Sequence, residues 1–173
     1  MNYGDLKSHF NDLLNRSDIT ASLTQRFIDQ GIARIQRQLR TPMQERVFNT
    51  TISEATKSLT LPSDFLEIIS LYHSQYELER VSMQRYRELQ DSSFTGKPKY
   101  FAREIEKLHL HPEPSDGTLA LYYYAEFPVL SEDSDTNTLT DIAPDLVIYA
   151  AMTYASDYYL DERAVVFEQK YQQ

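Results

Sequence analysis

The spacing of the apolar residues changes twice along this chain, and these changes limit the folds that it can adopt. In residues 1–45 apolar side chains recur every three or four positions, which is the period of an amphipathic helix. Residues 46–142 instead hold short β-rich runs separated by turn residues, and residues 143–173 return to a helical pattern. We therefore predict an α+β fold within a single domain. In this fold an N-terminal helix pair and a long C-terminal helix form a helical bundle, and the middle of the chain is an inserted antiparallel, sandwich-like β-rich region.

The ends of the chain carry helix signals that place each helix more closely. We expect a first helix over about Tyr3–Arg16 and a second one that begins at a cap formed by Thr20 or Ser22 and runs toward Arg40. The apolar stripe of the second helix has spacings of four, three and four residues, at Ile28, Ile32, Ile35 and Leu39.

The C-terminal segment is expected to form one long helix. Pro144 suits a first helical turn, and neither glycine nor proline follows it in Asp145–Gln173. If unbroken, this helix would span about 43 Å at 1.5 Å per residue. Its first half is apolar on every side and should be buried, whereas apolar residues after Asp157 lie in a charged context and would need a partner surface.

Turn residues in the middle of the chain predict two hairpins. The short runs Arg46–Ile52 and Lys57–Leu61 are expected to pair with each other. The strands Lys107–His111 and Thr118–Phe127 are expected to pair across the turn Pro112–Gly117, which combines rigid prolines with a permissive Asp-Gly. The remaining elements expected here are strands at Phe65–His73 and Lys99–Arg103 and a short helix near 82–90, capped by Ser82.

The overall composition excludes several classes of function. The net charge of -9 argues against a grip on nucleic acid, because affinity for phosphate comes from clustered lysine and arginine. The chain has no cysteine, which rules out disulfides and thiolate metal sites. Its first ten residues lack the apolar core of a signal peptide, and no run approaches the ~18 apolar residues of a membrane span. We expect a protein without membrane contact.

Three groups of residues resemble metal-binding or charged interaction sites, and each has a structural explanation that fits better. His109 and His111 share one face of a strand but lack further ligands nearby, so they are expected to be solvent-facing strand residues. The series Asp133, Asp135 and Asn137 begins like a calcium loop and then departs from it. Four arginines are expected on a charged solvent face of the second helix, at Arg26, Arg34, Arg37 and Arg40. We predict no catalytic, cofactor or metal site.

A series of motifs, each weak alone, occurs in an order that resembles one known family. The motifs are Leu61–Ile68 (LPSDFLEI), Gly96–Phe101 (GKPKYF), Leu108–Pro112 (LHLHP) with Asp116–Gly117, Tyr122–Tyr124, Pro128–Ser131 and Ala143–Tyr149. In this order the chain resembles the phage head-to-tail adaptor, or connector, proteins of short-tailed and related phages. The resemblance covers most of the chain except residues 75–93.

The resemblance implies a structural protein of the virion that carries no cofactor and performs no reaction. Such proteins form a homo-oligomeric ring, typically a dodecamer, between the portal protein and the tail or nozzle proteins. DNA passes through the channel without specific binding, and assembly takes place in the host cytoplasm. A closed ring needs two different patches on each subunit. We expect these patches in the β-rich middle and the C-terminal helix, at Tyr122, Tyr124, Tyr158, Tyr159, Val165, Val166, Phe167 and Tyr171.

Three alternatives to this interpretation remain open at the level of sequence. A phage neck or tail-completion protein of different symmetry would share most of the same features. A carbohydrate-binding β-module could use exposed tyrosines, although it gives no reason for the C-terminal helix. A peptidoglycan hydrolase used during infection would need a pair of acidic residues at a defined separation, which sequence does not supply.

Overall fold

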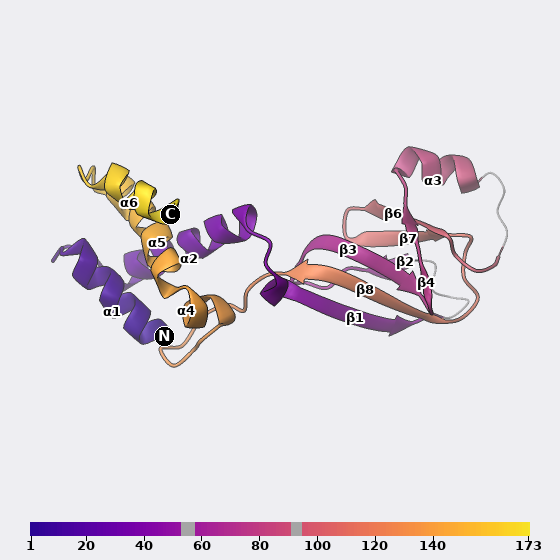
Figure 1. The fold of residues 1–173 in the computed structure, drawn as a ribbon, viewed down its shortest axis with the longest axis horizontal. Coiled ribbons are helices and arrows are strands. Elements are labelled where there is room, and N and C mark those ends of the chain that lie inside the picture. The colour runs from indigo at the N-terminus through magenta and orange to yellow at the C-terminus, as the bar shows by residue number, and fades with distance from the viewer. Residues whose placement is uncertain (53–57, 91–94) are drawn as a thin grey trace. The chain divides into compact units, whose positions relative to one another are not determined.

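A computed structural model describes residues 1–52, 58–90 and 95–173 and divides the chain into two compact units. The helical unit consists of Met1–Arg40 together with Phe127–Gln173, and the β-rich unit consists of Thr41–Glu126. Figure 1 shows the helices of the first unit and the two sheets of the second. This confirms the predicted α+β class. No helix in the described ranges has the length and apolar character needed to cross a bilayer.

The helical unit contains five helices, counted over the residues that the structure describes. They are α1 (Tyr3–Leu14), α2 (Ala21–Gln38), α4 (Thr138–Ile142), α5 (Pro144–Tyr158) and α6 (Ala164–Tyr171). The first two confirm the prediction, and Thr20 is the N-cap of α2, with its side chain accepting a hydrogen bond from the Leu23 N–H. Asn2 caps α1 in the same way through the Asp5 N–H.

The core of the helical unit is built around the contact between α2 and α5. Ile28 and Ile35 on α2 and Val147 and Ile148 on α5 are fully or almost fully buried. Gly31 lies at the closest approach of the two helices, where an added Cβ would stand 2.8 Å from the backbone nitrogen of Ala151. Only a residue without a side chain fits there, because the obstacle is backbone that cannot rotate away.

The C-terminal helix is broken, which corrects the prediction of one long helix. The chain leaves α5 after Tyr158 and begins α6 at Ala164. Leu160 adopts a left-handed backbone with φ of 52°, and the Asp161 N–H donates to the Ser156 carbonyl at 2.8 Å, closing the end of α5. Because this cap uses leucine rather than glycine, the sequence contains none of the usual signals for a helix end.

The break is stabilised by contacts that bring α6 back onto the other helices. Asp161 pairs with Arg163 at 2.7 Å, and the same guanidinium donates to the carbonyls of Leu13 and Leu14 at the end of α1. The guanidinium thus supplies hydrogen bonds to carbonyls that α1 itself leaves unsatisfied. In this way the break allows α6 to pack on the bundle instead of extending beyond it.

The β-rich unit is a sandwich of two four-stranded sheets. The strands are β1 (Glu45–Thr51), β2 (Ser58–Thr60), β3 (Phe65–His73), β4 (Tyr76–Glu77), β5 (Glu79–Arg80), β6 (Tyr100–Glu104), β7 (Lys107–His111) and β8 (Thr118–Ala125). One sheet has the order β1-β8-β3-β4 and the other β2-β7-β6-β5. Their facing side chains form one apolar core, with Leu71 and Leu121 from the first sheet and Leu108 and Leu110 from the second. A 3-10 turn (Pro42–Gln44) precedes β1, and helix α3 (Met83–Gln90) confirms the predicted short helix.

Both predicted hairpins are wrong in their pairing, although the strands themselves were placed well. β1 pairs with β8, and β2 pairs with β7, so the first two strands lie in different sheets. Lys57, the expected start of the second run, lies outside the described residues. The turn Pro112–Gly117 carries the chain from one sheet to the other, and β7 instead pairs with β6. Turn residues specify where the chain reverses but not which strand it joins.

The acidic loop before α4 belongs to the helical unit, whereas the sequence placed it in the β-rich insertion. The backbone N–H groups of Tyr3 and Gly4 donate to the carbonyls of Asp135 and Asp133, each at 2.9 Å. Lys7 forms an ion pair with the carboxylate of Asp133. The loop is therefore fixed against the N-terminal end of α1, where negative charge is favourable.

Candidate interaction surfaces

The residues predicted for the C-terminal interface fall into two groups in the structure. Tyr158, Val165 and Val166 are exposed, whereas Tyr159 is half-buried and Phe167 and Tyr171 are buried in the core of the helical unit. The cause is the break after α5, which turns one face of α6 inward. Only the exposed group is available for contact with another molecule.

The inward-facing tyrosines hold the helices together. The guanidinium of Arg16 lies 4.1 Å from the ring centre of Tyr159, and that of Arg34 lies 4.1 Å from the ring centre of Tyr171. The Tyr171 hydroxyl donates to the side-chain carbonyl oxygen of Gln38. Burial raises the pKa of both hydroxyl groups. These side chains therefore contribute to the stability of the helical unit.

A small apolar surface lies at the junction of α5 and α6. We call it the C-terminal patch and define it as Tyr158, Leu160, Val165 and Val166. Leu160, which the sequence did not single out, is 89% exposed because its left-handed backbone directs it away from the core. The side chain of Leu160 gains nothing from burial within the subunit and is available for contact with another molecule.

The two predicted tyrosines of β8 lie on the outer face of their sheet. Side chains alternate along the strand, so Tyr122 and Tyr124 point away from the core while Tyr123 points into it. The rings of Tyr122 and Tyr72 meet edge to face with centres 5.6 Å apart, and Val47 is the cross-strand partner of Tyr122. We call Val47, Tyr72, Tyr122 and Tyr124 the tyrosine face.

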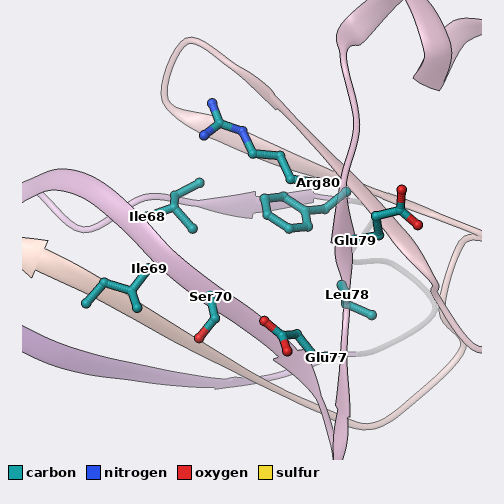
Figure 2. A pocket seen from close by; sticks show the side chains of 8 residues that line it. Ile68, Ile69, Ser70, Glu77, Leu78, Glu79 and Arg80 are labelled. Carbon is teal, nitrogen blue, oxygen red and sulfur yellow. The ribbon is translucent and has the colours of Figure 1, made fainter.

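A groove of about 460 Å³ opens at one side of the sandwich, next to β3. Figure 2 shows Ile68, Ile69 and Ser70 of β3 along one wall and the segment Glu77–Arg80 along the other. Phe101 of β6 completes the lining. The groove thus has an apolar interior and charged groups at its rim, which suits contact with a chain segment better than with a small ligand.

The two strand histidines are packed against α3, which corrects the expectation that they face solvent. Tyr86 of α3 lies over both rings, with its ring centre 5.6 Å from that of His109 and 6.4 Å from that of His111. A nitrogen of His109 also lies 2.9 Å from the carboxylate of Glu104. In the described ranges, no cluster of three or more potential ligand side chains is arranged to hold a metal.

The loop that begins like a calcium site uses its polar groups internally. The carboxylate of Asp135 accepts hydrogen bonds from the N–H groups of Ser131 and Glu132, each at 2.8 Å. These bonds keep the pKa of Asp135 below its usual value. Asn137 caps α4 by accepting from the Thr140 N–H. The side-chain oxygens of Asp135 and Asn137, which a calcium site would use as ligands, thus accept hydrogen bonds from the backbone of the loop and of α4.

One arginine of α2 departs from the predicted charged solvent face. Arg34 forms two hydrogen bonds to Glu168 of α6, at 2.6 and 2.8 Å, and a third to the Thr153 hydroxyl at 3.0 Å. This pairing holds the pKa of Glu168 at about 2, below its usual range. The ion pair fastens α6 to α2 and α5.

The sequence model of the SU10 adaptor protein family matches residues 1–173. This chain belongs to that family. The match agrees with the resemblance to phage head-to-tail adaptors and covers both units. No curated protein sequence matches the chain.

The adaptor is therefore a structural phage protein. Exposed apolar residues lie at the C-terminal patch of the helical unit and at the tyrosine face and neighbouring β1 of the β-rich unit, and others lie elsewhere, such as Ile105, Val129 and Ile142. The sequence singled out the tyrosines of β8, and their place in an interface stays a prediction. It missed β1 and the groove beside β3, because their exposure depends on which strands become sheet edges.

Proposed function

We propose that this adaptor assembles into a ring between the portal protein and the tail or nozzle proteins of a phage, and that the phage DNA passes through the ring. The observation that carries the proposal is the presence of two exposed apolar surfaces of different composition, one on each unit. In a ring, every subunit meets its neighbours through two different patches, and further surfaces must bind the components above and below.

The C-terminal patch is the surface that we assign to the portal. It consists of three aliphatic side chains and one tyrosine, and it lies at a helix junction held in shape by the Asp161–Arg163 pair. Exposed apolar residues on a rigid support form the central contacts of many protein interfaces. The tyrosine face is assigned to the tail or nozzle proteins, because tyrosines provide large contact areas that tolerate water at the rim.

The charge of the adaptor fits a passage for DNA. A net charge of -9 makes the protein surface repel phosphate on average, so a duplex would move past it without binding. We assign the finished ring to the neck of the virion and its assembly to the host cytoplasm. Twelvefold symmetry is proposed from the resemblance to other head-to-tail adaptors.

Sedimentation velocity of the adaptor, alone and mixed with the portal ring of its source phage, tests this proposal. We expect saturable binding near one adaptor per portal subunit. Val166→Asp in the C-terminal patch should weaken this binding about tenfold or more, since a buried unpaired charge costs several kcal/mol at an interface. Ile142→Asp is the matched control, because Ile142 is also an exposed aliphatic residue, at 60% against 47% for Val166, but lies outside the patch.

Three results would argue against the proposal in different ways. A wild-type adaptor that never sediments with the portal would contradict the portal-binding role. Binding that Val166→Asp and Ile142→Asp weaken equally would contradict the assignment of the C-terminal patch. A stoichiometry far from one per portal subunit would instead favour a neck or tail-completion protein of different symmetry.

A further inference from the structure

Among the described residues, strand β1 presents a free backbone edge. It is the outermost strand of its sheet and pairs only with β8 among the described strands. The Ile52 N–H donates to the Gly117 carbonyl at 2.8 Å. Because hydrogen-bonded residues alternate in an antiparallel ladder, Val47, Asn49 and Thr51 direct their N–H and C=O groups toward the free edge.

This edge lacks the features that usually protect a strand from pairing with another chain. From Val47 to Thr51 the strand contains no charge and no proline. Val47 is 49% exposed on the outer face, and Phe48 is 36% exposed on the opposite, core-facing side. A core-facing phenylalanine that stays exposed indicates that the apolar layer continues beyond the end of this sheet.

The opposite side of the same sheet has a second free edge. β4 covers only the last residues of β3, at Tyr72 and His73. Among the described strands, none lies beside Ile68–Ser70 on that side, and this stretch forms the wall of the groove in Figure 2. A strand added there would cover the groove with its core-facing side chains, over Ile68, Leu78 and Phe101.

We propose that β1 of one adaptor subunit pairs with the free edge of β3 in a second copy of this chain, so that the sheet continues from subunit to subunit. Phe48 then enters the neighbour's groove. The two edges lie on opposite sides of one sheet, so the contact is head-to-tail and each subunit can use both edges at once. This inference deepens the proposed ring and rests on it.

The direction of the pairing follows from the topology. β1 and β3 are both antiparallel to β8, so they run parallel to each other within a subunit. Copies in a ring of many subunits differ by a small rotation, about 30° for twelve, which preserves strand direction. The contact between β1 and the neighbouring β3 is therefore parallel.

Because the adaptor has no cysteine, introduced pairs report this contact directly. Ser70→Cys is combined in turn with Val47→Cys, Asn49→Cys and Thr51→Cys, all on the outer face. Within one subunit β8 separates these positions by two strand spacings, about 9.6 Å, which is too far for a disulfide. Oxidation should therefore give a ladder of multimers for at least one of the three pairs. The matched control, Asn49→Cys with Ala120→Cys, joins direct neighbours and should give only an internal disulfide.

A second variant tests the edge without cross-linking. Asn49→Pro removes an N–H that points away from β8, so the β1–β8 ladder keeps its own hydrogen bonds. We expect this variant to lose self-association at least tenfold, while Asn49→Ala retains it. Circular dichroism establishes that both variants are folded.

The outcomes separate this inference from the proposed function when oxidation is done with and without the portal ring. Portal binding at the expected stoichiometry without a ladder in any of the three pairs would overturn the edge pairing and leave the portal role intact. A ladder without portal binding would support the edge pairing and contradict the portal role. Neither ladder nor portal binding would overturn both.

Discussion

The two units of the adaptor differ in the kind of surface that each one leaves exposed. In the helical unit, α1, α2, α5 and α6 all turn apolar faces toward a shared core, and an ion pair from Arg34 to Glu168 ties the last helix to the rest. In the β-rich unit a continuous core lies between the sheets, but β1 and the groove beside β3 remain uncovered. The helical unit thus has a complete core and exposes apolar side chains at its C-terminal patch, whereas the β-rich unit also exposes strand edges that can pair with another chain.

Because of this difference, substitutions in the two units should have different effects. A substitution in the core of the helical unit meets close-packed backbone and should affect folding. A substitution at the open edges of the β-rich unit meets solvent in the monomer and should affect assembly. This contrast is tested by Gly31→Val, Tyr86→Ala and Arg34→Met.

The largest effect is expected at Gly31, where the helical unit is most tightly packed. Gly31→Val places a branched side chain against the backbone of Ala150 and Ala151, within 3.2 Å or less of three backbone atoms. We expect a loss of about 3 kcal/mol in the free energy of unfolding, at the upper end of overpacking costs. Urea denaturation measures it, with Gln30→Val, an exposed neighbour on α2, as control. Equal stability of the two variants would contradict the close packing of α2 on α5.

A smaller effect is expected for the helix of the β-rich unit, which depends on one buried residue. Tyr86 is the buried side chain of α3 and packs on His109 and His111. Tyr86→Ala should free α3 at a cost of about 2 kcal/mol, since the helix can detach while the sheets stay folded. Trypsin should then cleave faster at Arg85 and Arg87. Unchanged cleavage relative to a Gln84→Ala control would show that α3 has another anchor.

The smallest effect is a pH dependence located in the helical unit. The folded pKa of Glu168 is about 2, below the ~4.3 of an unfolded glutamate, because Arg34 stabilises the charged form. Its contribution to stability is therefore complete above about pH 4.3 and is lost as the pH falls toward 2. The Glu168 side chain is 43% exposed, so solvent screening limits this contribution to about 1 kcal/mol.

Arg34→Met should remove this part of the acid sensitivity. Urea unfolding at pH 6 and pH 3 should show a smaller stability difference for Arg34→Met than for the wild type. Arg26→Met, on the same helix, should keep the wild-type difference. If all three proteins lose the same stability on acidification, the ion pair does not stabilise the helical unit.

The sequence predicted the local elements of the adaptor better than their partners. Helix caps such as Thr20, and the β-branched run of Phe65–His73, have local causes and were placed correctly. Strand pairing depends on contacts between distant segments, so β1 and β2 were assigned to each other although they belong to different sheets. The break near Leu160 was missed because a left-handed leucine gives no sequence signal.

The residues predicted for the interfaces show the same limit of prediction from sequence. Tyr122 and Tyr158 are exposed, as a role in an interface requires, but Phe167 and Tyr171 are buried because of the unexpected turn between α5 and α6. Phe48 attracted no attention in the sequence, where it resembles any strand residue. Its significance comes from the position of β1 at the end of the sheet.

The most direct test of the contrast between the units is amide hydrogen exchange of the adaptor, free and assembled with its portal. We expect assembly to slow amide exchange in β1, above all at the outward-facing amides of Val47, Asn49 and Thr51. Exchange should also slow along β3 at Ile68–Ser70. The exchange rates of the buried parts of α2 and α5 should stay unchanged. Protection confined to the helical unit, with β1 exchanging as fast as in the free protein, would contradict this expectation.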